Sequence, residues 1–228
     1  MTSKKLLLYY FLTANSLLQR LFVIIITITI LSLLATGINI REYNFTITYL
    51  PIKDCGNPNR DVIHINGAYP PPPIRASVGE IIRVNMINHM QKDNITLHFH
   101  GIRQRGTPLA DGVPFITQYQ TEPNKTYTYE FVACPEQAGT YFYHSHVGLT
   151  TITGHGALII YDKTHPFEYD DERIIVLSDF WNNTDTDDVL EAGLYASPLK
   201  FVGSPADLLI NGRTGGNNND KCGPDKIW

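Results

Sequence analysis

The chain has 228 residues, of which 22 are acidic and 18 are basic, so its formal net charge is −4. Its hydrophobic share of 43% is that of an ordinary folded protein. These values argue against a disordered or collagen-like chain, and the slight acidic excess argues against nucleic acid as a partner. The hydrophobic residues are unevenly spread, however, so the N-terminal segment needs its own interpretation.

An uncharged apolar run, Leu21 to Ile40, follows a segment whose charged residues are all basic: Lys4, Lys5 and Arg20. A basic flank before a hydrophobic run is typical of segments that enter the secretory pathway. The run is long enough to cross a bilayer as a helix, while the small residues Ala35 to Gly37 suit a signal peptidase. We therefore predict that residues 1–40 form a hydrophobic helix. The sequence leaves open whether it is a cleaved signal peptide or a transmembrane anchor through residues 21–40.

Asn-x-Thr sequons agree with an exported glycoprotein that is extracellular or membrane-anchored, with its folded part facing outside; they lie at Asn44, Asn94, Asn124 and Asn182. The cysteines are Cys55, Cys134 and Cys222. Because their number is odd, at most one internal disulfide can form, and the remaining cysteine is either buried and unpaired or bonded to another chain.

From Arg41 onward the sequence predicts β-structure. The runs Tyr43–Tyr49 and Thr126–Val132 alternate with period two and are rich in β-branched and aromatic residues. Further strand-like runs occur at Glu80–Ile87, Ile95–His100, Thr140–His144, Gly156–Tyr161 and Arg173–Leu177. Turn signals separate them, including Asn66-Gly67, Asp111-Gly112 and Asn211-Gly212. Many short strands at this spacing, with no amphipathic helix of four turns, predict an all-β sandwich or barrel.

A change in composition near Lys163 to Asp171 marks a domain boundary. We assign residues 41–165 to a first β domain and residues 166–228 to the beginning of a second, incomplete domain. The second part has too few apolar strands to form a stable domain alone. The prolines at 70–73 are interpreted as a turn that leads into a strand at Ile74, although a polyproline ligand is the alternative.

The strongest chemical signal is a pair of His-x-His motifs, which consist of His98 and His100 and of His144 and His146. Each pair lies at the end of a predicted strand, where residues i and i+2 share a face. Each motif therefore offers two imidazoles side by side, and imidazole suits Zn, Cu, Fe or Ni. The pattern favours a metal site over histidines that serve only as polar groups.

The sequences around both pairs resemble the first two copper signatures of the multicopper oxidases, a family that includes laccases, ascorbate oxidases and fungal ferroxidases. The matching segments are Leu97 to Gln118 (LHFHGIRQRGTPLADGVPFITQ) and Gly139 to Gly148 (GTYFYHSHVG). The likeness extends over Arg41 to Asp162 and continues weakly to Arg213. It implies a Greek-key cupredoxin, or plastocyanin-like, sandwich followed by the start of a second cupredoxin domain.

The resemblance also implies roles for individual residues. His98 would bind the type 2 copper, and His100, His144 and His146 would bind the type 3 copper pair. The chain would thus supply half of the ligands of a trinuclear cluster, and a C-terminal cupredoxin domain that is absent here would supply the rest. Asp111 would be a proton relay beside the cluster, although capping of its turn is the alternative. The other histidines, His64, His89, His155 and His165, are interpreted as surface or packing residues.

The family's type 1 copper needs a cysteine with two histidines. No histidine lies within two residues of any cysteine in this chain, so we expect type 1 copper only in the missing domain. The resemblance implies the N-terminal part of an oxidase that couples oxidation of a phenol, an ascorbate-like compound or Fe(II) to reduction of O2 to water. By itself the chain is predicted to be inactive. The alternative is a copper-binding cupredoxin module without oxidase activity.

Some properties stay open at this point. The reducing substrate cannot be chosen, because its pocket belongs to the missing domain, and neither can a natural truncation be told from an incomplete gene model. Relatives tend to tie their first domain to the second near Cys55 and Cys222, so the resemblance favours a bond between these two and a free Cys134.

Overall fold

The computed structural model describes residues 18–27, 39–51, 61–164, 167–181, 190, 192–200, 204–205 and 207–213. The chain divides into two compact units, Met1–Ile38 and Asn39–Trp228. In the first unit residues 18–27 are helical. None of the helices in the described part of the chain has the length and apolar character needed to span a membrane. Residues 1–17 and 28–38 of the predicted hydrophobic helix lie outside the described residues, so that prediction stays untested there.

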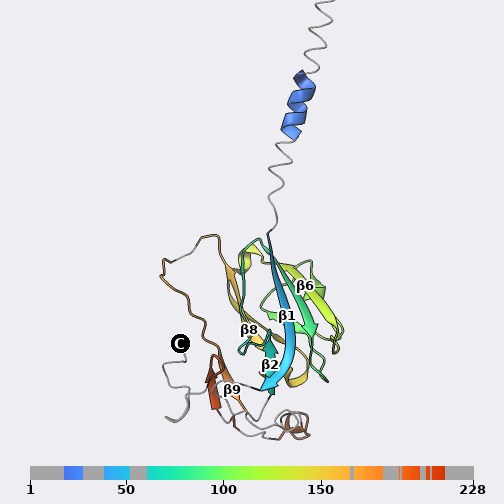
Figure 1. Ribbon diagram of the computed structural model, residues 1–228, viewed down its shortest axis with the longest axis vertical. Helices are drawn as coiled ribbons and strands as arrows, with labels where there is room; N and C mark the ends of the chain where they lie inside the picture. Colours follow the sequence, from blue (N-terminus) through green and yellow to red (C-terminus); the bar gives the residue numbers. More distant parts are fainter. Residues whose placement is uncertain are drawn as a thin grey trace, which may run out of the picture. The chain divides into compact units, whose positions relative to one another are not determined.

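The second unit is built from two four-stranded sheets (Figure 1). The first sheet has the order β2-β1-β4-β6, with β1 at Ile40–Pro51, β2 at Asp61–Ile65, β4 at Ile81–Asn88 and β6 at Thr126–Val132. The second has the order β3-β8-β7-β5, with β3 at Ile74–Ser77, β5 at Leu97–His100, β7 at Gly139–Ser145 and β8 at His155–Tyr161. The pairs β1/β4 and β3/β8 are parallel and the others are antiparallel. This is the mostly-β sandwich that the sequence predicts.

One hydrophobic core lies between the sheets, and alternation along the strands builds it. On β4, for example, Ile82, Val84 and Met86 are buried while the residues between them are half exposed. Phe99 from β5 and Tyr143 from β7 are fully buried, and the Tyr143 hydroxyl donates a hydrogen bond to the Pro72 carbonyl at 2.7 Å. Burial of apolar area in this core is the main source of the fold's stability.

The Asn-Gly pairs form the predicted turns. Asn66 and Gly67 have φ values of 54° and 74°, and Asn211 and Gly212 have φ values of 51° and 75°. Two consecutive positive values are those of a type I′ turn. Short 3₁₀ helices occupy other connections: η1 at Pro108–Ala110, η2 at Pro135–Gln137 and η3 at Gly148–Ile152.

The strand predicted at Arg173–Leu177 is wrong in its position. Residues 171–176 are irregular, and β9 begins at Leu177 and ends at Phe180, where it pairs with β10 at Asp207–Ile210. Side chains hold the preceding segment instead of a neighbouring strand: Glu172 forms an ion pair with Arg75. The apolar residues at 174–176 therefore follow the sandwich without joining either of its sheets.

The β9/β10 pair packs against the first sheet through a small second core. Val62 of β2, Phe180 and Leu209 are buried together, and Tyr69 packs against them. Since Ile63 and Ile65 face the main core, β2 is covered on both sides. Cys134 is a free cysteine, while Cys55 and Cys222 lie outside the described residues, so their pairing stays a prediction.

Candidate metal centre

Two adjacent strands of the second sheet carry the histidine pairs. In the antiparallel register of β5 and β7, His98 lies opposite His144, and His100 lies opposite Phe142. The intervening residues Phe99 and Tyr143 point into the core. Because side chains alternate across a strand, the histidines project from the outward face. Because Phe99 and Tyr143 are buried in the core, the alternation along β5 and β7 turns the imidazoles outward.

The imidazoles converge closely. His98, His100 and His144 each offer a ring nitrogen, and these atoms all lie within 4.8 Å of one another. The ring centroids are 5.3 Å apart for His98 and His144 and 5.6 Å apart for His98 and His100. His146, one residue beyond β7, lies 5.5 Å from His98 and 5.8 Å from His144 between centroids. The structure therefore brings all four predicted histidines into one cluster.

The two sides of the cluster differ in exposure. His98 and His144 are half-buried, whereas His100 and His146 are exposed. Burial lowers the pKa of His144, a backbone hydrogen bond raises it, and the neighbouring histidines lower it further, for a net lowering. A lowered pKa keeps the imidazole neutral, which is the form that binds a metal.

Backbone carbonyls select the tautomers of the half-buried pair. Nδ1 of His98 lies 2.6 Å from the Asp111 carbonyl oxygen, and Nδ1 of His144 lies 2.8 Å from the Ser145 carbonyl oxygen. A carbonyl only accepts, so both Nδ1 atoms carry the proton. Nε2 is then the atom with the free lone pair in each ring, as expected of metal ligands whose other nitrogen is held by the protein.

Asp111 contacts His98 mainly through its main chain. The carboxylate Oδ1 lies 3.5 Å from His98 Nδ1, farther away than the carbonyl oxygen of the same residue. The Asp111 side chain is 29% exposed. The residue therefore orients the imidazole with its carbonyl and places a partly solvated carboxylate beside it.

Gly112 makes this contact possible, a role that the sequence suggested only as a turn. Its φ is +78°, and a Cβ at this position would lie 1.8 Å from the Leu97 carbonyl oxygen. Only glycine lets the loop lie this close to β5. The close approach brings the Asp111 carbonyl within reach of His98.

Phe142 is a part of the site that sequence reasoning missed. Its ring stacks on His100 with a centroid distance of 4.8 Å and on His144 with one of 5.0 Å, at interplanar angles of 18° and 24°. The signal was available, because Phe142 lies two residues before His144 and shares its face. Phe142 packs against two of the imidazoles although it is itself 45% exposed.

The other histidines that the structure describes lie outside the cluster. His64 is buried on β2, where its Nδ1 donates to the Val62 carbonyl at 3.1 Å, and His89 is exposed. His155 lies opposite His144 on β8, and its Nδ1 contacts the Thr151 carbonyl at 3.3 Å. Burial lowers the pKa of His155. His165 lies outside the described residues.

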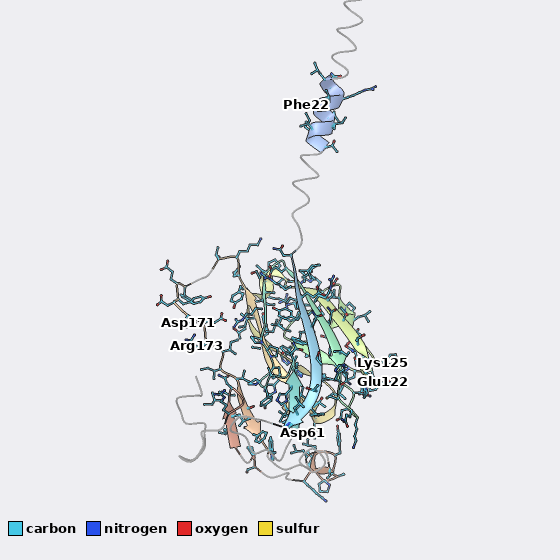
Figure 2. All side chains as sticks on the ribbon, in the orientation of Figure 1. Phe22, Asp61, Glu122, Lys125, Asp171 and Arg173 are labelled. Carbon is cyan, nitrogen blue, oxygen red and sulfur yellow. The ribbon has the colours of Figure 1, made fainter. Side chains whose placement is uncertain are left out.

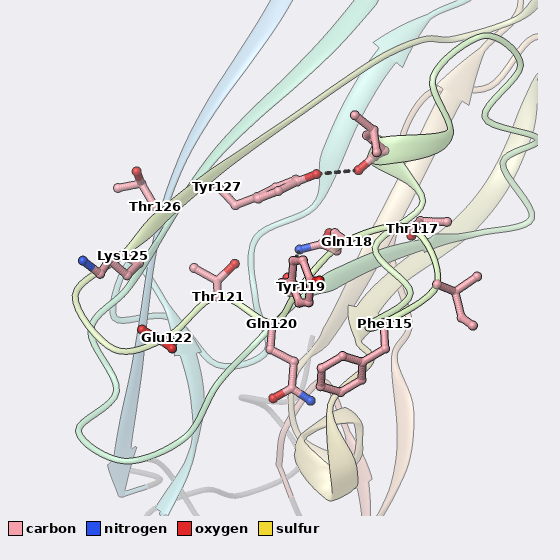
Figure 3. A pocket seen from close by; sticks show the side chains of 12 residues that line it. Phe115, Thr117, Gln118, Tyr119, Gln120, Thr121, Glu122, Lys125, Thr126 and Tyr127 are labelled. Atoms are coloured by element: carbon pink, nitrogen blue, oxygen red, sulfur yellow. Dashed lines mark hydrogen bonds between the residues drawn. The ribbon is translucent and has the colours of Figure 1, made fainter.

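A groove of about 760 Å³ lies along the loop that follows Asp111 (Figure 3). Phe115, Ile116 and Tyr119 line one part of it, and each is more than 70% exposed. Tyr127 closes another side, where its hydroxyl donates to the Leu109 carbonyl at 2.8 Å. The groove is thus a largely apolar surface beside the loop that holds His98.

Comparison with known proteins decides the family. The family model of the multicopper oxidases matches residues 46–165, which contain the whole histidine cluster. The chain belongs to the multicopper oxidases. This oxidoreductase family uses copper, and a set of converging imidazoles fits that metal. The family assignment made from the two histidine motifs is therefore confirmed.

Individual multicopper oxidases are similar to the same part of the chain. L-ascorbate oxidase of Cucumis sativus is 39% identical over 179 residues, which is 76% of this chain and 30% of that protein. Laccase-1 of Cryptococcus neoformans is 38% identical over 186 residues, or 76% of this chain and 28% of the relative. The crystal structure of Fet3p, a multicopper oxidase that functions in iron import, superposes with a TM-score of 0.68 and 32% identity.

The match covers 77% of this chain and 33% of the Fet3p chain. The chain thus spans about a third or less of the length of these relatives. Its similarity to an ascorbate oxidase, a laccase and an iron-import oxidase is of comparable size. Family membership therefore leaves the reducing substrate undetermined.

Proposed function

We propose that the chain is the copper-binding N-terminal part of a secretory-pathway multicopper oxidase. The complete enzyme would oxidise a phenol, an ascorbate-like compound or Fe(II) and reduce O2 to water. The convergence of three ring nitrogens within 4.8 Å, on one outward sheet face, carries this proposal. In the proposed division of the chain, residues 1–40 direct export, residues 41–165 form the copper-binding cupredoxin domain, and residues 166–228 begin a second one.

In this proposal the four histidines supply half of a trinuclear copper cluster. His98 would hold the type 2 copper, and His100, His144 and His146 would hold the type 3 pair. Bound copper would store the electrons that pass from substrate to O2. The exposed side of the cluster, at His100 and His146, would face the ligands that another domain contributes.

The protein's own groups would orient ligands and handle protons. The Asp111 carbonyl keeps the proton of His98 on Nδ1, and the Ser145 carbonyl does the same for His144. Reduction of O2 consumes protons, and the partly solvated Asp111 carboxylate is placed to pass them from water toward the cluster. Phe142 limits rotation of the two imidazoles on which it stacks.

A copper titration of the full-length chain tests the ligand assignment. Competition with a coloured Cu(I) chelator should show binding that weakens by at least about 100-fold in His98→Ala and in His144→Ala, since even outer-shell changes cost 10- to 100-fold. His89→Ala is the matched control, because His89 is exposed and outside the cluster. Equal affinities for all three variants would contradict the assignment.

The alternative function is a copper-binding module without oxidase activity. It is favoured by the sequence itself, in which no cysteine has a histidine within two residues and hence no type 1 motif occurs. We expect the copper-loaded chain to oxidise neither phenols nor Fe(II) by itself. Turnover of either substrate would contradict that expectation, whereas tight stoichiometric copper binding without turnover would favour the module.

A further inference from the structure

The sequons of the β domain lie in very different surroundings. The three that the structure describes all have threonine as their third residue, in the segments Asn44–Thr46, Asn94–Thr96 and Asn124–Thr126. Their chemistry as acceptors of an N-linked glycan is therefore the same. What distinguishes them is their exposure and the hydrogen bonds of the asparagine.

The sequon at Asn124 is the most open. Asn124, Lys125 and Thr126 are all exposed, in the turn that leads into β6. Figure 2 shows Glu122 and Lys125, which flank this asparagine, at the edge of the strand domain. Asn124 has a φ of 61°, and its backbone N–H donates to the Asn88 carbonyl at 2.7 Å. The main chain is thus fixed while the side chain lies at the surface.

The sequon at Asn44 lies on the outward face of the first sheet. Asn44 is exposed, while Phe45 beside it points into the core. The Asn44 amide contacts Asn85 through its oxygen, which accepts a hydrogen bond at 3.0 Å. The Nδ2 atom of Asn44, to which a sugar would be attached, takes no part in this contact.

The sequon at Asn94 is enclosed by comparison. Ile95 and Thr96 are both fully buried, and Ile95 is bonded on both backbone groups to Thr121. The Asn94 Nδ2 atom, to which a sugar would be attached, donates to Gln120 Oε1 at 2.9 Å. A glycan on this nitrogen would have to displace the Gln120 side chain from its hydrogen bond.

We propose that the side of the domain formed by the β2-β1-β4-β6 sheet carries N-linked glycans, with Asn124, in the turn that leads into β6, as the main attachment site and Asn44, on the outward face of β1, as a second one. Asn94 stays unmodified. The proposal rests on the export into the secretory pathway inferred above. The copper ligands project from the other sheet, so glycans on this face leave the histidine cluster accessible.

The modification needs a lipid-pyrophosphate-linked oligosaccharide as donor. A bond forms between Nδ2 of the asparagine and C1 of the first N-acetylglucosamine, and the bond between C1 and the pyrophosphate oxygen breaks. The lipid pyrophosphate leaves with the electron pair, and the amide releases one proton to the base of the transferase. No oxidant or reductant takes part.

The test is expression of the full chain in a yeast secretory host, followed by glycosidase treatment and mass spectrometry of the peptides. Three valine substitutions remove single hydroxyls while keeping a β-branched side chain. Thr126→Val removes the Asn124 sequon without altering the asparagine in its positive-φ turn. Thr96→Val removes the Asn94 sequon and is tolerated, because the Thr96 hydroxyl is buried without a hydrogen-bond partner. Thr140→Val, at an exposed strand position outside any sequon, is the matched control.

We expect Thr126→Val to lose one glycan and Thr96→Val and Thr140→Val to keep the wild-type pattern. The peptide containing Asn44 should be occupied less completely than the one containing Asn124. Loss of a glycan in Thr96→Val, or an unmodified Asn124 in a chain that has entered the lumen, would overturn the proposal. Protease protection of microsomes shows entry into the lumen independently, and copper titration tests the proposed function separately.

Discussion

The outward faces of the two sheets differ in how their polar side chains are satisfied. On the first sheet, Asn85 donates to Glu42 at 2.7 Å and to Asn44 at 3.0 Å, and it accepts from Thr128 at 3.0 Å. On the second sheet, by contrast, His98 and His144 are each held at Nδ1 by a carbonyl. Their Nε2 atoms therefore keep the free lone pair that a metal ligand needs.

The same strand geometry thus supports two kinds of surface, a hydrogen-bonded polar face and a face of histidines with free nitrogens. Both faces are built by alternation over one core, so the fold by itself does not create the proposed metal site. The second sheet adds two neighbouring elements: a close loop at Gly112, which brings a carbonyl to Nδ1 of His98, and the Phe142 ring, which stacks on His100 and His144. Variants at Gly112 and Phe142 test whether these residues cause the difference between the two faces.

The largest effect is expected for Gly112→Ala. The new Cβ would lie 1.8 Å from the Leu97 carbonyl oxygen, so β5 or the loop must move. We expect a loss of more than about 3 kcal/mol in unfolding free energy, as for other severe backbone clashes. Gly106→Ala in the same loop is the control, since its φ is +79° but nothing lies within 4 Å of the added Cβ. Urea unfolding that gave equal losses for both variants would contradict the role of close approach.

Phe142→Ala should loosen the copper ligands with little change in stability. The ring is 45% exposed, so its removal costs little burial, but His100 and His144 lose their stacked neighbour. We expect copper affinity to fall by about 10-fold, as for other residues that orient ligands. Phe115→Ala, which removes a 71% exposed ring from the neighbouring loop, should leave affinity unchanged. A Phe142→Ala chain with wild-type affinity would show that the stacking has no positioning role.

The ion pair between Arg41 and Glu80, at the first sheet, should make the stability sensitive to acid. Arg41 lowers the pKa of Glu80 below its ordinary value of 4.5 through a hydrogen bond of 2.9 Å, and the Ser77 N–H adds to the lowering. A lowered folded-state pKa means that this stabilisation is present above pH 4.5 and is lost as the pH falls through the folded pKa. Glu80→Gln should remove that part of the pH dependence. Unfolding curves of the wild type and the variant measured across this range check it, and parallel curves would contradict it.

The smallest effect is expected for Asn85→Ala, at the centre of the polar network on the first sheet. Its hydrogen bonds are exposed, so their loss should cost less than about 1 kcal/mol. Copper affinity should not change, because the histidines lie on the other sheet. A change in copper affinity would show that the two faces are coupled.

Sequence reasoning placed the strands best where one face is buried and the other is polar. β6 begins at Thr126 and ends at Val132, as its alternating pattern predicted. β2 lacked that signal because it is covered on both sides, by the main core and by the β9/β10 pair. The run at 173–177 is apolar from residue 174 on, but residues 173–176 have no neighbouring strand, so the predicted strand was placed too early in the chain.

The sequence alone determined the family, the β class and the four candidate ligands, because these depend on local motifs and on the period of hydrophobicity. Tertiary structure decided what lies around the ligands. The register of β5 against β7 placed His98 opposite His144, and the packing of Gly112 on Leu97 gave His98 a carbonyl instead of a carboxylate as its hydrogen-bond partner. Such contacts join residues far apart in the chain, so they follow from three-dimensional packing and from no local pattern.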